Sequence, residues 1–214
     1  MSEELSRWYR GRLVVGPFRP LEVSELDKLE REVGLPLPPS YRSFLAAAGG
    51  GSLPYSVRVP ACEPEPLQSF DDLHQLGRDG QGAYDWGTLL GEYRRSRVGR
   101  LGGEVSPVGL LPIARNGGGD TLFLDLNPGT YGRLHALVHG IPHPGYLSEN
   151  VLTTVAADFD SYLDSLVVDP DLAQDTWADV ADSDATDPWH CAAYFARLRT
   201  MAKLAAARHI PTAT

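Results

Sequence analysis

Three short runs rich in apolar residues in the middle of the chain limit its possible folds more than any other feature. They span about residues 110–114, 121–126 and 133–139, and the second and third show the two-residue period of a β-strand. Asn127-Pro128-Gly129 lies between the second and third runs and is typical of a tight turn. The sequence therefore predicts successive antiparallel strands of one sheet.

Helices are predicted on both sides of these strands along the chain. Apolar residues recur at three- and four-residue steps over about 21–33, and Gly34 is suited to end that helix. A second helix begins at about Ser40 and stops at Gly49-Gly50-Gly51. A third amphipathic helix, over 155–166, is placed to cover the sheet. A mostly antiparallel sheet flanked by N- and C-terminal helices is an α+β fold.

The segments between the second helix and the sheet carry weaker patterns. Residues 55–59 alternate between apolar and polar and predict a strand. Ser69-Phe70-Asp71-Asp72 has the spacing of a capping box, which predicts a short helix through Leu76. Residues 78–107 form a long excursion rich in glycine and arginine, with one helix expected at about 88–97.

Two parts of unequal size are expected. The first is an α+β domain over residues 1–169, with its core at about 20–167. The second, over residues 170–214, is an appendage made of an acidic segment and a C-terminal helix. Asp187-Pro188 provides a suitable cap and first turn for that helix.

Composition excludes several classes of protein. A formal net charge of −9 argues against a nucleic-acid binder, which needs a basic surface. No stretch approaches the roughly 18 apolar residues that a bilayer crossing needs, and the acidic start is unlike a secretory signal. Cys62 and Cys191 are distant from each other and lack a partner motif, so we expect a cytoplasmic protein.

The histidines do not form a convincing metal site. His135, His139 and His143 are four residues apart, but glycine and proline in the same stretch disfavour a helix that would bring them together. On a strand, His135 and His139 lie about 13 Å apart at about 3.3 Å per residue, too far for one ion. We expect solvent-facing strand histidines and no bound metal.

Other catalytic patterns are also absent from the sequence. Asn116-Gly117-Gly118-Gly119-Asp120 lacks the Lys-Ser/Thr of a phosphate-binding loop and is expected to be a turn. Asp120 and Asp125 have an odd separation, which places them on opposite faces of a regular strand. No serine stands in a Gly-x-Ser-x-Gly turn, and neither cysteine has a nearby histidine. We expect a protein that is not an enzyme and that needs no small-molecule cofactor.

Three blocks in order resemble the SUKH superfamily over residues 20–167. The matching segments are Leu29-Glu30, Val33-Gly34-Leu35, Leu37-Pro38-Pro39-Ser40-Tyr41-Arg42-Ser43-Phe44-Leu45, Gly49-Gly50-Gly51, Leu111-Pro112-Ile113-Ala114, Gly118-Gly119-Asp120, Leu124-Asp125 and Val155-Ala156-Ala157-Asp158-Phe159-Asp160-Ser161-Tyr162-Leu163. The chain departs from the superfamily at Ala48, where an asparagine is usual, and in the 78–107 excursion.

The resemblance implies a protein that binds other proteins. Many bacterial members are immunity proteins that occlude and neutralise a polymorphic toxin domain, often a nuclease. A fungal relative regulates cell-wall synthesis, so a regulatory or scaffold protein is the alternative. A hydrolase with an unfamiliar site at Asp120 or His135 is a third, less favoured hypothesis.

The charge distribution indicates where such a partner would bind. No Lys or Arg occurs between Leu134 and Ala196, so aspartates dominate there. The candidate partner-binding residues are Asp171, Asp175, Trp177, Asp179, Asp182, Asp184, Asp187 and Trp189. Carboxylates suit the basic groove of a nuclease toxin, and tryptophan is common at interface hot spots. Two alternatives stay open: solvated charges only, or tryptophans that pin the tail to the domain.

Overall fold

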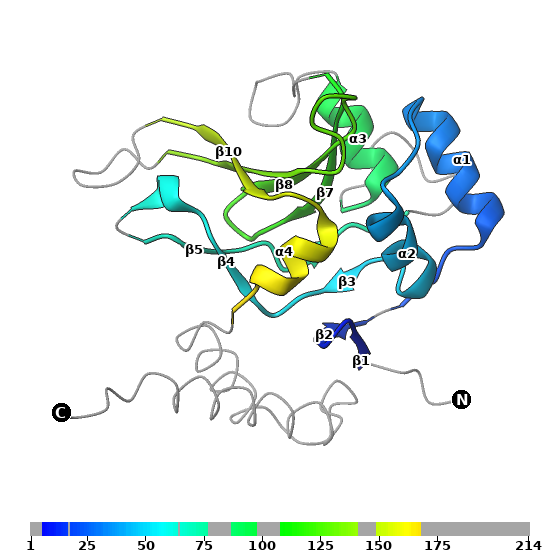
Figure 1. The fold of residues 1–214 in the computed structure, drawn as a ribbon, viewed down its shortest axis with the longest axis horizontal. Helices are drawn as coiled ribbons and strands as arrows, with labels where there is room; N and C mark the ends of the chain where they lie inside the picture. The colour runs from blue at the N-terminus through cyan, green and yellow to red at the C-terminus, as the bar shows by residue number, and fades with distance from the viewer. Residues whose placement is uncertain are drawn as a thin grey trace.

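A computed structural model describes residues 6–16, 18–63, 65–76, 87–97, 108–140 and 149–167 of the chain. Its elements in chain order are β1 (Ser6–Tyr9), β2 (Arg12–Val15), α1 (Val23–Val33), α2 (Pro39–Ala47), β3 (Gly51–Ser52), β4 (Ser56–Arg58), a 3₁₀ turn (Pro60–Cys62), β5 (Leu67–Ser69), β6 (Asp72–Leu73), α3 (Leu89–Arg97), β7 (Leu110–Arg115), β8 (Thr121–Asp125), β9 (Leu134–Val138), β10 (Val151–Ala156) and α4 (Phe159–Ser165). The predicted α+β class is confirmed (Figure 1).

One large sheet dominates the fold. Its eight strands have the order β1-β2-β3-β6-β7-β8-β9-β10, and every neighbouring pair is antiparallel. β4 and β5 form a separate two-stranded sheet, which an antiparallel bridge from Ser56 to Val167 links to the end of α4. Among the described residues, no helix has the length and hydrophobicity needed to span a membrane.

The first side of the sheet, which we call the α4 side, is apolar. Register places Leu111, Leu122, Leu124, Leu134 and Ala136 on it, and all are buried. α2 and α4 pack on this side (Figure 1). The ring of Phe159 lies 5.1 Å from that of Tyr41 and 5.0 Å from that of Phe44, measured between ring centroids. This aromatic cluster joins the first and last parts of the domain.

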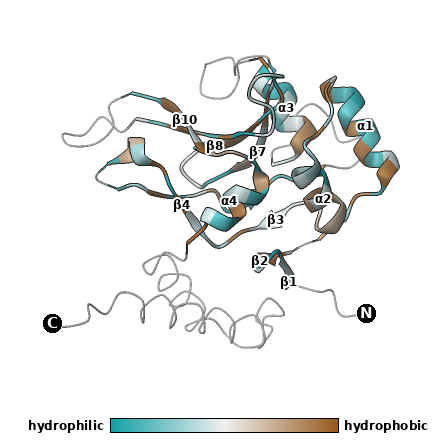
Figure 2. Ribbon diagram, viewed as in Figure 1, coloured by the Kyte–Doolittle hydropathy of each residue, from teal (hydrophilic) through white to brown (hydrophobic). Residues whose placement is uncertain are grey.

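The opposite side, which we call the α3 side, is more polar. Register places Asp72, Arg115, Thr121, Asp125 and His135 on it. α3 covers part of this side and is largely hydrophilic, in contrast to α2 (Figure 2). β8 is nevertheless buried on both sides along its whole length. The two faces of one sheet therefore meet very different surroundings.

A buried ion pair lies between α3 and the sheet. The carboxylate of Glu92 accepts hydrogen bonds from the Arg95 guanidinium and, at 2.8 Å, from the backbone N–H of Gly87. Both charged residues are nearly inaccessible to solvent. His74 is buried nearby, and its Nδ1 has no hydrogen-bond partner among the described residues. Burial lowers the pKa of His74 to about 4, so this imidazole is neutral at pH 7.

The two Gly-Gly-Gly segments, residues 49–51 and 117–119, have different structural roles. Gly49 has φ +73°, and a Cβ added there would lie 1.7 Å from the Arg19 carbonyl oxygen. This glycine therefore permits a close backbone crossing where Arg19 donates its N–H to the Ala48 carbonyl. A Cβ at Gly117, in the second triplet, would meet nothing within 4 Å. That second triplet forms a turn, as the sequence predicts.

Several predicted boundaries are confirmed and others are wrong. Gly34 ends α1 with φ +80°, and the strands at 110–115, 121–125 and 134–138 agree closely with the prediction. The helix predicted at 69–76 is wrong, because Asp72–Leu73 instead pairs between β3 and β7. The sheet provides long-range partners there that outweigh the local capping pattern.

The helix predicted over 155–166 begins later than expected. Residues 151–156 form β10, the strand paired with β9, and α4 starts at Phe159. The carboxylate of Asp158 accepts the Ser161 backbone N–H at 2.6 Å, which fixes the start of the helix. The N-terminal hairpin β1–β2 was not predicted, and the Arg10 guanidinium on it pairs with Asp160 of α4 at 3.3 Å.

Candidate partner-binding surface

All eight residues predicted to bind a partner lie outside the described part of the chain. They are Asp171, Asp175, Trp177, Asp179, Asp182, Asp184, Asp187 and Trp189. His143 and Cys191 also lie outside it. The surface that the structure describes is therefore that of the residues before 168.

The carboxylates of α1 are largely compensated by arginines. Glu25 pairs with Arg19 at 2.6 Å, and Glu32 pairs with Arg94 of α3 at 2.7 Å. A third arginine, Arg42 of α2, bridges Asp27 and Glu30 at 2.7 and 3.3 Å. These pairs orient α1 against three other segments.

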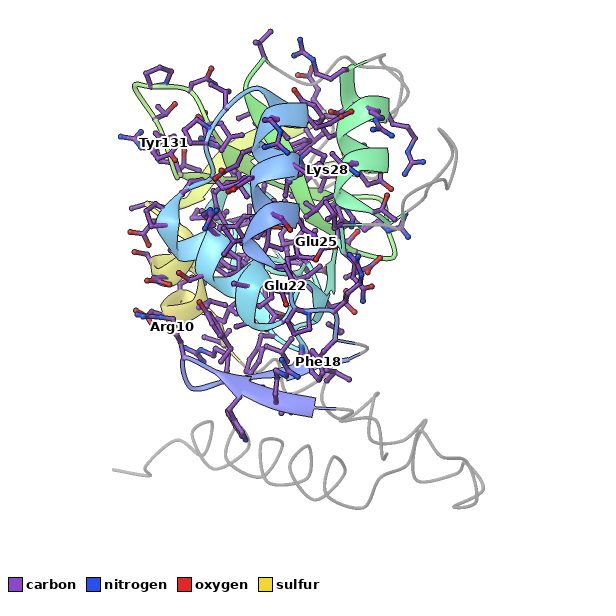
Figure 3. The ribbon with its side chains drawn as sticks, turned by 90° about the vertical axis from the view of Figure 1, so that its right-hand side faces the viewer. Arg10, Phe18, Glu22, Glu25, Lys28 and Tyr131 are labelled. Atoms are coloured by element: carbon purple, nitrogen blue, oxygen red, sulfur yellow. The ribbon has the colours of Figure 1, made fainter. Side chains whose placement is uncertain are left out.

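The exposed edge of α1 carries charges of both signs. Glu22, Glu25 and Lys28 follow one another along it (Figure 3). The mixture of signs, together with the arginine pairs, leaves α1 without a strong acidic surface for a basic partner.

A hydrogen-bonded series crosses three strands on the α3 side. His135 of β9 places Nε2 3.2 Å from the Asp125 carboxylate of β8 and Nδ1 3.1 Å from the Thr154 hydroxyl of β10. Burial alone raises the pKa of Asp125, but hydrogen bonds from Thr130, Asn127 and His135 hold it below its ordinary value. An ionised carboxylate can only accept, so it accepts a hydrogen bond from Nε2–H of His135, and in the neutral ring Nδ1 accepts a hydrogen bond from the Thr154 hydroxyl.

A second aspartate holds His139, the residue that directly follows β9. Asp120 accepts the backbone N–H of His139 at 2.8 Å, and its Oδ1 lies 3.1 Å from His139 Nδ1. Asn116 binds the other oxygen of Asp120 at 2.9 Å. Asp125 and Asp120 thus contact different histidines, and the two aspartates do not form a carboxylate pair.

These contacts correct the expectation of solvent-facing histidines. The side chains of His135 and His139 are only 15% and 35% exposed, because each is held against a carboxylate. Within the part of the chain that the structure describes, no group of three His, Cys, Asp or Glu side chains is placed to hold a metal ion. Cys62 is buried, which raises the pKa of its thiol and makes it a poor nucleophile.

The Thr154–His135–Asp125 series has the residue types of a hydroxyl nucleophile, a base and an orienting carboxylate. In serine hydrolases the carboxylate holds Nδ1 and the nucleophile faces Nε2. Here the ring is reversed, since Nε2 faces Asp125 and Nδ1 faces Thr154. The contact from His135 therefore links adjacent strands of the sheet, and we assign it a structural role.

A surface cavity of about 190 Å³ lies where α1, α3 and the turns of β7 and β8 meet. Its apolar walls come from Val33, Leu35, Val108 and Leu126, and Tyr93, Arg97, Gly109 and Asn127 complete the lining. The Val108 side of this pocket is open to solvent, because that residue is 72% exposed. Sequence reasoning missed this pocket, since its walls come from four separate segments and no local pattern joins them.

The helices α1 and α2 precede most strands of the antiparallel sheet and the short helix α4 follows the last one, which is an α+β arrangement. The sequence model of the SMI1 / KNR4 family (SUKH-1) matches residues 20–165, and the chain belongs to that family. Members of this family are generally non-enzymatic immunity or regulatory proteins. No curated protein and no solved structure matches the chain.

Proposed function

We propose that this chain is an immunity protein that binds a cognate toxin domain with a basic surface and neutralises it without chemistry of its own. The observation that carries the proposal is the family match, which spans most of the domain. A toxin that cleaves nucleic acid needs Lys and Arg to hold phosphates, and such a groove is a suitable target for an acidic inhibitor.

The charge distribution supports the basic partner. Acids of α1 in the described domain are already paired with arginines, as shown above. Residues 169–187, by contrast, contain aspartates and neither Lys nor Arg. We therefore propose that this acidic segment steers the toxin, with Trp177 and Trp189 as anchors.

The arrangement of the histidines supports binding over catalysis. His135 and His139 are each held by an aspartate and link neighbouring strands or turns. Both ring nitrogens of His135 have partners within the domain, so this ring is not poised to act on a substrate. Inhibition by occlusion requires only a stable surface.

The proposal predicts a toxin gene beside the gene for this chain, and the test uses the toxin domain that such a gene encodes. Co-expression should protect cells from that toxin, and the purified proteins should form a complex whose association slows as salt concentration rises. The combined variant Asp175→Lys, Asp179→Lys, Asp182→Lys should slow association at low salt by at least about tenfold. Glu149→Lys, a reversal at an exposed acid outside the segment, is the control and should have little effect.

Two outcomes would count against this proposal. Failure of the chain to protect cells or to bind the toxin would favour the regulatory or scaffold alternative. An unchanged association rate for the triple variant at low salt would show that the acidic segment does not steer the partner.

A further inference from the structure

The cavity between α1 and α3 has the size of a single side chain. Its volume is about 190 Å³. An apolar cavity of about 150 Å³ in another protein binds benzene, so a phenyl ring fits here with room for its methylene group. The pocket is therefore suited to one anchoring residue, not to a large cofactor.

The walls of the pocket are held in place before any ligand arrives. Tyr93 donates its hydroxyl to the Val33 carbonyl at 3.2 Å, which joins α3 to the end of α1. The Asn127 amide donates to the Val108 carbonyl at 3.0 Å and to the Asp125 carboxylate at 2.8 Å. A preformed site loses less conformational entropy on binding than one that must be ordered.

Gly109 is required for this close packing. It has φ +83°, and a Cβ added there would lie 2.3 Å from the Asn127 side-chain oxygen. The backbone of Gly109 also accepts the Leu126 N–H at 2.8 Å. The two turns that form this wall are therefore locked to each other.

The pocket also has a charge preference. Arg97 is exposed at the last turn of α3 and makes no ion pair or hydrogen bond with any described residue. Its neighbour Arg94 is already paired with Glu32. A guanidinium that pairs with no described residue and lies beside an apolar pocket favours a ligand that carries a carboxylate next to its apolar group.

We propose that this pocket is an anchor site for a partner protein that inserts a phenylalanine followed by an acidic residue. The inference rests on the proposed function, since it takes the partner to be a protein. The pocket would be a second contact with the partner, with the opposite charge preference. The acidic segment steers a basic surface of the partner, whereas the pocket binds a Phe-Asp or Phe-Glu dipeptide segment. Buried aromatic anchors of this kind commonly dominate interface energies.

The direct test is an NMR titration of the ¹⁵N-labelled full chain with the peptide acetyl-Gly-Phe-Asp-Gly-amide. Saturable shifts are expected at the amides of Gly109, Leu126 and Asn127. A peptide with Gly in place of Phe should produce none of these shifts, and one with Lys in place of Asp should bind at least about threefold more weakly. Absence of saturable shifts at about 10 mM peptide, or equal shifts from the Gly peptide, would overturn the proposal.

Two variants separate the apolar and charged parts of the pocket. Val108→Asp places a carboxylate at an exposed wall and should abolish the shifts without unfolding the domain. Arg97→Glu should reverse the preference, so that the Lys peptide binds more tightly than the Asp peptide. If Arg97→Glu leaves the preference unchanged, the carboxylate part of the proposal is wrong.

The toxin complex distinguishes failure of the pocket from failure of the proposed function. Val108→Asp should accelerate dissociation at least about tenfold, with little dependence on salt. If the toxin binds this variant as tightly as the natural chain, the pocket is not the anchor although the immunity function stands. If no toxin binds at all, the immunity function fails and the peptide titration still decides the pocket.

Discussion

The two sides of the sheet show how one domain combines stability with recognition. The α4 side buries leucines and aromatic rings, whereas the α3 side holds polar side chains that find partners on other strands and on α3. Apolar packing stabilises any domain with enough buried area. Paired polar groups fix the positions of individual side chains. The walls of the pocket beside α3 are held by polar contacts of this kind.

The largest expected effect is on the α4 side. Phe159→Ala removes a fully buried ring from the cluster with Tyr41 and Phe44, and it should lower the free energy of unfolding by about 3–5 kcal/mol. Urea denaturation followed by tryptophan fluorescence measures this loss. Val23→Ala, at a residue 63% exposed, is the control and should change stability by less than about 0.5 kcal/mol.

The buried ion pair of α3 should give the next largest effect. Glu92→Ala leaves the Arg95 charge buried without its nearest carboxylate, and it should cost about 3 kcal/mol in the same denaturation experiment. Replacing both residues, Glu92→Leu with Arg95→Met, should cost clearly less, because no charge then remains buried. If the double variant is as unstable as the single one, the pair contributes through shape and not through charge.

The lowered pKa of His74 predicts how the free energy of unfolding depends on pH. Burial holds its folded pKa at about 4, while nearby Glu92 and Asp72 raise it and Arg115 and Arg95 lower it. The unfolded chain, with the ordinary pKa of 6.5, binds more protons between these values, so stability falls as pH drops from 6.5 toward 4. The contribution is fully present above pH 6.5, and roughly 2.5 kcal/mol of it should be lost by pH 4.5.

The variant His74→Leu isolates this contribution. It removes the titrating group, so its free energy of unfolding should fall less between pH 7 and pH 4.5 than that of the natural chain. Denaturant titrations at both pH values measure the difference. Parallel losses in the two proteins would show that other groups cause the acid sensitivity.

The cross-strand series on the α3 side should give the smallest effect. His135→Ala removes two hydrogen bonds, one of them to an ionised carboxylate, and should cost about 1–2 kcal/mol. Thr154→Val removes only the exposed end of the series and should cost under about 1 kcal/mol. Thermal unfolding of the two variants orders them, and the reverse order would contradict the contacts described here.

The difference between local sequence patterns and long-range contacts explains which elements could be predicted from the sequence. Of the eight strands in the large sheet, β7, β8 and β9 were predicted correctly, β8 and β9 because their apolar residues alternate. α1 was predicted because its glycine cap and its periodicity agree. β6 was predicted as a helix, since its partners β3 and β7 are distant in the chain. Local pattern identifies elements that are locally consistent, and it fails where distant partners decide the structure.

The candidate site was less predictable than the fold. Aspartates and histidines were noted in the sequence, but nothing there shows that Asp125 faces His135 or that His135 faces Thr154. The pocket needs the ends of α1, α3, β7 and β8 together. The acidic segment was identified from charge alone, and its role in binding stays a prediction.

Hydrogen exchange of the full chain, with and without a saturating amount of the cognate toxin domain, tests directly whether the pocket and the acidic segment bind the toxin. We expect added protection around Val108–Gly109 and Leu126–Asn127 and within residues 170–189, with little change in α2. Protection confined to other surfaces, or no protection at all, would contradict the claim that this domain recognises a toxin through the pocket and the acidic segment.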